Sequence, residues 1–187
     1  QLLEIEERKQ ESYLKHYKGN GINETPLYIS HLMDLAPVYD QVEDGARLFH
    51  FRKQQIPDAN KMQKRPDAKN IYFVAFNPFR DHWKKGNGQP GDSLKIVKEA
   101  ILNHGAYGIK VYPPSGYRAT DNVSIDRETD KVMRRPRNLF QASSKRQWDA
   151  RYKNVSGAEI DHRLDKLYAW CEKNDLPIFT HCGLGEF

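Results

Sequence analysis

The chain has 187 residues, enough for one domain with a substantial core, and it carries two cysteines and a formal net charge of +5. Its apolar content is 38% and its mean hydropathy is −0.85. No stretch approaches the ~18 apolar residues of a membrane span, and the acidic, amphipathic opening is not a secretory signal. Two cysteines exclude a disulfide framework and favour a reducing compartment, so we expect a cytoplasmic protein with no membrane association.

The elements predicted before residue 70 are short or polar. The opening segment, of mixed charge, predicts a helix that ends at the strong stop signal Gly-Asn-Gly of residues 19–21. Residues 26–30 predict a short strand, and His31 begins the loop after it. Residues 52–70 are rich in Lys, Arg, Gln and Pro, which is typical of an exposed helix or loop.

A buried strand and an amphipathic helix come next. Residues 71–76 form an unbroken apolar run rich in β-branched and aromatic side chains, which is typical of a strand buried on both faces in a parallel sheet. Asp92 is a good N-cap for a helix that ends at residues 103–105 and whose apolar residues recur at helical spacing. These apolar residues are Leu94, Val97 and Ile101.

The remaining chain predicts two strands separated by a long insertion and a helix. Residues 107–112 predict a strand, and residues 115–155 predict an inserted polar and basic loop region. Ser156 and Glu159 form a capping-box pattern at the start of a helix. One face of that helix is apolar and consists of Ile160, Leu164, Leu167 and Cys171. Residues 177–181 predict a last strand with a histidine at its end.

The order of these elements predicts an α/β fold with parallel strands. A (β/α)8 barrel uses about 30 residues per unit, and the strands that begin at Ile71 and Tyr107 are 36 residues apart. The step to Pro177 is 70 residues, which corresponds to one unit plus the insertion. We therefore predict a partial (β/α)8 TIM-type barrel, in which residues 1–187 are a single incomplete domain. It comprises about the first half of the barrel, with the basic insertion after residues 107–112, the third strand predicted in this chain and the fourth strand of the barrel. An open doubly wound sheet is the structural alternative, but no Gly-x-Gly-x-x-Gly follows any predicted strand.

Lys110 is the candidate catalytic residue. Side chains alternate along a strand, so Lys110 shares a face with Gly108 and Tyr112, opposite to Ile109 and Val111. The apolar pair suits packing under helices, which turns the lysine toward the barrel interior. There it has two functional interpretations, a carbamylated lysine that bridges two metal ions or a cation for a substrate carboxylate or phosphate. A lysine paired with a buried carboxylate is an equally favoured structural interpretation.

His181 is the candidate metal ligand. It stands at the carboxyl end of the last strand, directly before a glycine-rich loop, and a neutral imidazole is a good ligand for a divalent ion. Cys182 points the other way and is better explained as a small buried residue. His31, with Asp34 three residues on, also follows a strand and is a weaker candidate for lining the same pocket. The other histidines lie in predicted helices or polar loops and are not expected to act in catalysis: His16, His50, His82, His104 and His162.

Two strand motifs resemble a known family. Residues 105–114 (GAYGIKVYPP) and 176–183 (LPIFTHCG) are similar to the fourth and fifth strands of the amidohydrolase superfamily. The helix residues 167–172 and the strand at 71–76, with its following Asn-Pro, are similar too. The branch of closest resemblance contains the amidohydrolase-related hydrolases and decarboxylases.

This resemblance implies a metal-dependent (β/α)8 barrel that acts on amide, ester, lactone or related bonds. Its metal site draws a His-x-His from the first strand, sometimes a Lys or Glu from the fourth, histidines from the fifth and sixth, and an Asp from the eighth. By match of motif, His181 takes the fifth-strand position, and Lys110 lies on the fourth strand. The other ligands have no counterpart here, so the first would precede Gln1 and the others would follow Phe187.

These features predict part of a metal-dependent hydrolase that acts on a small-molecule substrate. A divalent ion, expected to be zinc, would activate a water, and the remainder of the same polypeptide or a partner subunit would complete the barrel. A homo-oligomer is compatible with this prediction. One alternative is a catalytically inactive barrel that serves as a binding or scaffold module. The other is nucleic-acid binding through the basic segment 131–153, which ranks last because few aromatic side chains there are available for stacking.

Overall fold

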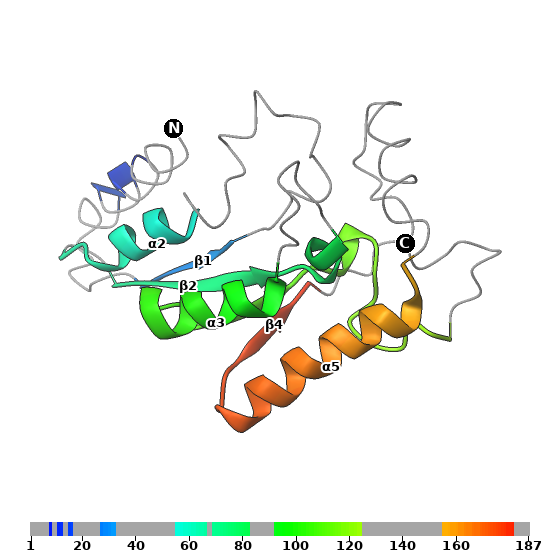
Figure 1. Ribbon diagram of the computed structural model, residues 1–187. Coiled ribbons are helices and arrows are strands. Elements are labelled where there is room, and N and C mark those ends of the chain that lie inside the picture. Colours follow the sequence, from blue (N-terminus) through cyan, green and yellow to red (C-terminus); the bar gives the residue numbers. More distant parts are fainter. Residues whose placement is uncertain are drawn as a thin grey trace.

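The computed structural model describes residues 27–32, 55–66, 69–82, 92–124 and 155–181, together with five helical residues between Arg8 and His16. Four parallel strands form one sheet in the order β1-β2-β3-β4 (Figure 1). The strands are β1 (Leu27–His31), β2 (Lys69–Phe76), β3 (Gly108–Val111) and β4 (Ile178–Thr180). The helices are α2 (Ile56–Gln63), α3 (Ser93–His104) and α5 (Gly157–Lys173), and two short 3-10 turns are η3 (Pro78–His82) and η4 (Pro113–Ser115). The predicted alternation of parallel strands and helices is confirmed.

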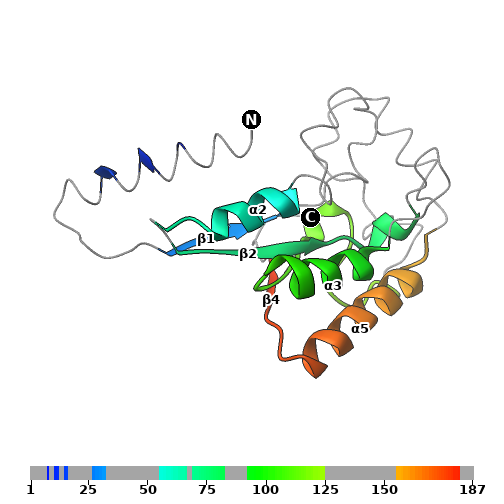
Figure 2. The same ribbon diagram turned by 60° about the vertical axis from the view of Figure 1, so that its left-hand side comes forward.

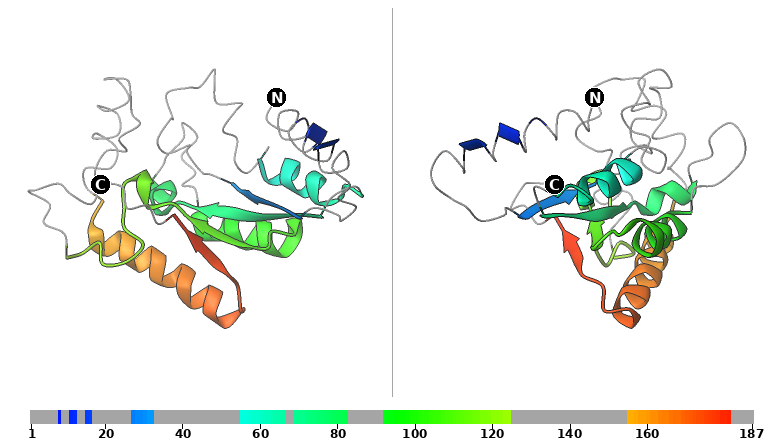
Figure 3. Two further views of the ribbon diagram at one scale, coloured as in Figure 1. Left: turned by 180° about the vertical axis from the view of Figure 1, so that it is seen from behind. Right: turned by 90° about the vertical axis from the view of Figure 1, so that its left-hand side faces the viewer.

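The sheet is strongly curled. In a flat sheet, three intervals of about 4.8 Å would separate β1 from β4 by about 14 Å. The ring centroids of His31 on β1 and Phe179 on β4 are nevertheless only 4.4 Å apart. β4 accordingly runs at a steep angle to β1 and β2, and α2, α3 and α5 follow one another around the sheet (Figures 2 and 3). The described residues thus form a half-barrel sheet with a concave and a convex face.

The helices form where the capping residues predict. The Asp92 side chain accepts a hydrogen bond from the Lys95 backbone N–H, and α3 ends at Gly105, whose φ of 72° is the left-handed conformation that suits glycine. Both hydrogen bonds of the capping box between Ser156 and Glu159 are present at the start of α5. The boundaries of both helices are therefore set by local sequence.

The main core lies between the convex face of the sheet and the helices. Val74, Ile109 and Val111 point from β2 and β3 into this layer and are fully buried. The predicted apolar face of α5 is buried there in full: Ile160, Leu164, Leu167 and Cys171. Burial of these side chains is the main stabilising term for the α/β layer.

Helix α2 differs from the exposed segment that its composition predicts. Ile56 is only 2% exposed and Met62 is buried as well. Polar residues of the same helix bond to the end of α3: Asn60 donates to the backbone carbonyl of His104 at 2.9 Å, and Gln63 donates to that of Gly105 at 2.7 Å. Two of the polar side chains of α2 therefore satisfy carbonyls at the end of α3, while others such as Lys61 are exposed.

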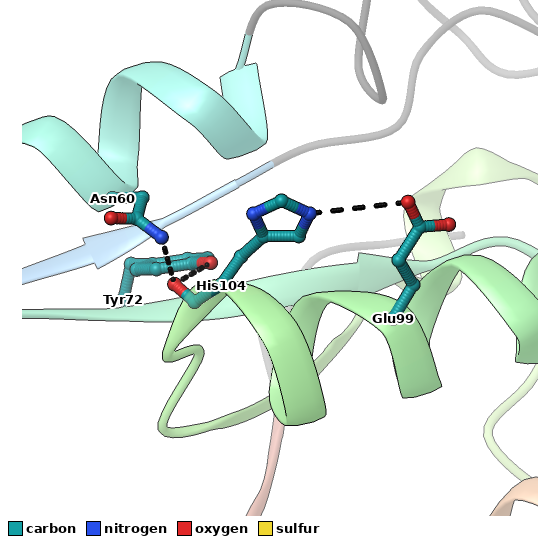
Figure 4. A network of polar contacts seen from close by, with 4 residues as sticks. All are labelled: Asn60, Tyr72, Glu99 and His104. Carbon is teal, nitrogen blue, oxygen red and sulfur yellow. Dashed lines mark hydrogen bonds and ion pairs between the residues drawn. The ribbon is translucent and has the colours of Figure 1, made fainter.

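These bonds belong to a polar network at the amino ends of the strands (Figure 4). The Tyr72 hydroxyl donates to the same His104 carbonyl at 2.8 Å, and the His104 ring lies 3.9 Å from the Glu99 carboxylate. The carbonyls at the end of α3 have no intrahelical donors. Side chains from α2 and β2 therefore donate the hydrogen bonds that these carbonyls accept. The backbone carbonyl of His104 is thus a shared acceptor for side chains of α2 and β2.

The start of the predicted insertion is tied to α5. The Asp161 carboxylate accepts hydrogen bonds from the backbone N–H and the side chain of Asn122 and from the backbone N–H of Val123, at 2.7–2.9 Å. At Gly157 an added Cβ would lie 2.1 Å from the Asn122 carbonyl oxygen, so the two segments are in direct contact. Residues 125–154, which include the basic segment 131–153, lie outside the described residues.

In the part of the chain that the structure describes, no helix combines the length and the apolar character that a membrane crossing requires.

Gly108 is the position where the curl leaves least room. A Cβ there would lie 2.8 Å from Cε1 of Phe73 and 2.5 Å from the carbonyl oxygen of Pro177. Gly108→Ala should lower the free energy of unfolding by about 1–3 kcal/mol, the usual cost of overpacking. Denaturant unfolding measures this, with Leu102→Ala at a 74% exposed position of α3 as the control. A Gly108→Ala protein as stable as this control would contradict the close packing of β2, β3 and β4.

Candidate functional site

One side chain from each strand meets on the concave face of the sheet. These are His31 on β1, Phe73 on β2, Lys110 on β3 and Phe179 on β4, which we call the concave cluster. The register explains the meeting, because His31 lies opposite Phe73 and Lys110 lies opposite Phe179 on neighbouring strands. Phe73 lies opposite Gly108, two residues before Lys110, so all four side chains fall on the same face.

The three rings of the cluster touch one another. The His31 centroid is 4.4 Å from that of Phe179 and 5.3 Å from that of Phe73, and the two phenylalanines meet edge-on at 6.0 Å. Such pairs contribute about 0.5–1.5 kcal/mol beyond the burial of their area. The ring of Phe73 has room for this because Gly108 carries no side chain. The rings of His31, Phe73 and Phe179 therefore form a continuous aromatic surface on the concave face.

Lys110 packs against this aromatic surface. The residue is only 5% exposed, and its Nζ stands 4.4 Å from the centroid of the Phe179 ring. The ring quadrupole attracts a cation, more strongly where water is excluded. Phe179 is thus a contact of the buried ammonium that the sequence analysis did not name. Lys110 faces away from Ile109 and Val111, which pack under the helices as their alternation predicts.

His31 is held in its neutral form. Its pKa is lowered from the usual value of 6.5, first by partial burial of the ring and second by the positive charge of Lys110. A neutral imidazole has one nitrogen lone pair available to accept a proton or to bind a metal ion. His31 was only a weaker candidate from the sequence, because its contact with Phe179 and its proximity to Lys110 depend on the curl of the sheet.

His181 follows the end of β4. Its backbone N–H donates to the carbonyl of Val111 at 3.3 Å, and its ring meets the Tyr112 ring edge-on, with centroids 5.4 Å apart. Ring contacts join Lys110 to Phe179 and His181 to Tyr112. The two predicted functional residues therefore stand on the neighbouring strands β3 and β4, near the carboxyl edge of the sheet.

The described residues supply part of a metal site at most. His181 is exposed and His31 is neutral, so each can contribute one imidazole ligand. Within the described ranges, no three or more His, Cys, Asp or Glu side chains lie close enough together to hold a metal ion. Asp34 and Cys182 lie outside those ranges. A bound zinc ion would therefore need further ligands from elsewhere.

Cys171 is a structural residue. It is buried on the inner face of α5, and burial raises the pKa of its thiol to about 11. A thiol with so high a pKa is a weak nucleophile at neutral pH. Its place in the core agrees with its position on the predicted apolar face.

Two tyrosines near the carboxyl edge were not predicted as functional. Tyr112 was expected on the Lys110 face of its strand, but nothing local indicates its contact with His181. Tyr117 hydrogen-bonds to the backbone of both β2 and the residue after β3. The only sequence signal for these contacts is the Pro-Pro-Ser-Gly turn that separates the two tyrosines.

Comparison of the chain with protein-family models, with curated proteins and with solved structures finds no match in any of the three. A function for this chain has to be argued from its own residues and contacts.

The charge of Lys110 should be visible in the titration of His31. Lys110→Met removes the positive charge but keeps an apolar side chain, so the pKa of His31 should rise toward 6.5 without reaching it, because burial remains. The wild-type protein should therefore take up this proton at lower pH than the variant. Below about pH 6.5, His31 binds a proton more readily in the unfolded chain than in the folded protein, where its pKa is lowered. Acidification from pH 6.5 downward should therefore lower the free energy of unfolding.

Titration of the His31 ring protons by NMR measures this directly. Lys98→Met is the matched control, because Lys98 lies over the Trp170 ring on the helical layer. Equal His31 pKa values in the wild type and in Lys110→Met would contradict the proximity of the Lys110 charge to the His31 ring.

Proposed function

We propose that this chain is part of a metal-dependent hydrolase of the amidohydrolase type, which cleaves an amide, ester or lactone bond of a small molecule. The observation that supports it best is the concave cluster, where a buried ammonium and a neutral imidazole meet on one face of a parallel sheet. Enzymes with parallel α/β sheets keep their active sites at the carboxyl ends of the strands, where His31 and His181 stand.

We propose further that the sheet belongs to a (β/α)8 TIM-type barrel. Among the described strands, β1 and β4 each pair with a single neighbour. Both carry exposed apolar side chains, namely Leu27 and Ile29 on β1 and Ile178 and Phe179 on β4. Unpaired apolar edges favour association with further strands. The remainder of the same polypeptide or a partner subunit would cover these edges and close the barrel.

In this proposal His181 is one of the metal ligands. Its ring stands at the carboxyl edge and is exposed, which fits one ligand position of a zinc site. Zinc bound there would lower the pKa of a coordinated water and polarise the carbonyl of the substrate. The remaining ligands would come from polypeptide outside the described ranges.

Lys110 and His31 would both act on the substrate from the concave face of the sheet. Nζ of Lys110 lies over the face of the Phe179 ring, which attracts a cation. An ammonium in this place would bind an anionic group of the substrate. His31, which Lys110 helps to keep neutral, would be able to accept a proton at neutral pH.

Removing the imidazole at position 181 tests the metal assignment. In the complete protein, His181→Ala should weaken zinc binding by at least about 10–100-fold, because loss of even an outer partner of a metal site has that effect. Turnover of ester, lactone and amide substrates should fall in parallel. Competition with a chromophoric chelator measures the affinity, and His162→Ala on the exposed side of α5 is the control. Unchanged zinc content and turnover in His181→Ala would remove His181 from the mechanism, whereas absence of zinc and of turnover in the wild-type protein would favour the scaffold alternative.

Removing the ammonium at position 110 tests its role toward the substrate. Lys110→Met should lower kcat/KM for anionic substrates by about 10–100-fold more than for neutral substrates of the same shape, as expected for a hydrogen bond to a charged group. Steady-state kinetics on matched pairs of neutral and anionic esters measures the difference. An equal loss on both, together with loss of bound metal, would instead indicate a carbamylated lysine that acts as a ligand.

A further inference from the structure

A buried tyrosine joins the carboxyl ends of two strands. The Tyr117 hydroxyl donates to the backbone carbonyl of Phe76, the last residue of β2, at 3.2 Å. The same oxygen accepts from the backbone N–H of Tyr112, the residue after β3, at 3.1 Å. Tyr117 is only 3% exposed, and its ring packs edge-on against Phe79 with centroids 6.0 Å apart. Its hydroxyl therefore has both a donor and an acceptor partner in a site that water does not reach.

The turn between the two tyrosines brings Tyr117 back to Tyr112. Residues Pro113–Ser115 form the 3-10 turn η4, and Gly116 follows with a φ of 111°, in the left-handed region that favours glycine. Within this turn the Ser115 N–H donates to the Tyr112 carbonyl at 3.0 Å. Both backbone polar groups of Tyr112 are thus bonded, one through the turn and one through Tyr117. The backbone of Tyr112 is held from two sides.

The ring of Tyr112 contacts the candidate metal ligand. The Tyr112 and His181 rings are 5.4 Å apart between centroids and inclined by 61°, an edge-to-face arrangement. The His181 backbone is also tied to β3, through its N–H and the Val111 carbonyl at 3.3 Å. The imidazole is therefore restrained by its own backbone and by a neighbouring ring whose backbone is itself restrained.

We propose that Tyr112 is a positioning residue that fixes the orientation of the His181 imidazole, and that the Tyr117 hydroxyl supports it. A ligand imidazole has to present one ring nitrogen in a fixed direction, and groups that hold the ring contribute to metal affinity. The role toward a metal rests on the proposed function. The orientation of the ring by Tyr112 is independent of it.

The test compares Tyr112→Leu, which removes the ring, with Tyr112→Phe, which removes only the hydroxyl. The first readout is the chemical shifts of the His181 ring protons in the metal-free complete protein, which a nearby aromatic ring displaces. We expect Tyr112→Leu to move these shifts and Tyr112→Phe to keep them. Tyr107→Leu is the control that removes an equal ring elsewhere, because Tyr107 directly precedes β3 and its ring packs against Phe73. Wild-type shifts in a folded Tyr112→Leu protein would overturn the proposal.

The second readout is zinc affinity. Tyr112→Leu should weaken zinc binding by about tenfold, the lower end of the range for residues that orient a ligand, and Tyr112→Phe should restore most of it. Zinc binding by Tyr112→Leu as tight as in the wild type would overturn the positioning role. Absence of zinc binding in the wild type would instead refute the proposed function, while displaced shifts in Tyr112→Leu would still establish the orienting contact.

Tyr117→Phe keeps the proposal testable if Tyr112→Leu fails to fold. This variant retains the buried ring and removes only the bridging hydroxyl, so Phe76 and Tyr112 each lose a partner. We expect it to move the His181 ring-proton shifts in the same direction as Tyr112→Leu, by a smaller amount. A stably folded Tyr117→Phe protein with wild-type shifts would show that the hydroxyl does not support Tyr112.

Discussion

The curl of the sheet, which brings the His31 ring against the Phe179 ring, is the constraint on which the rest of the structure depends. The two rings come from opposite edges of the sheet, and they meet only because the sheet curls. Gly108 makes room for this curl, since a side chain there would collide with Phe73 and with the backbone before β4. The same curl encloses the Lys110 ammonium and brings it close enough to His31 to lower the pKa of the imidazole. A flat sheet with the same register would leave Lys110 on an open face.

The two ends of the strands serve different purposes. At the amino ends, Asn60 and Tyr72 donate hydrogen bonds to the His104 carbonyl at the end of α3. At the carboxyl ends, the Tyr117 hydroxyl ties β2 to the residue after β3, and histidines stand at the ends of both edge strands. Parallel α/β enzymes share a division between a stabilising end and a reactive end of the sheet, and the proposed function rests on this likeness.

Local patterns predicted much of the fold. The cap at Asp92, the capping box at Ser156 and the apolar face of α5 depend on residues within a few positions of one another, and all are confirmed. Strand alternation likewise placed Lys110 opposite the helical layer. Local patterns could not predict the contacts of the candidate site. His31 and Phe179 lie far apart in the sequence, and their rings are in contact only because the sheet curls. The burial of Ile56 was missed because polar residues dominate that segment but bond to the end of α3. The metal, the substrate and the basic segment remain predictions.

The most direct test of the account is the proximity of His31 and Phe179 in solution. A nuclear Overhauser measurement between their assigned ring protons reports on this contact without requiring a metal, a substrate or activity. The account predicts a cross peak between the two rings in the wild-type protein, accompanied by one between Phe179 and the side-chain methylene groups of Lys110. Assigned resonances for all three residues with no cross peak among them would contradict the curled sheet and the site built on it.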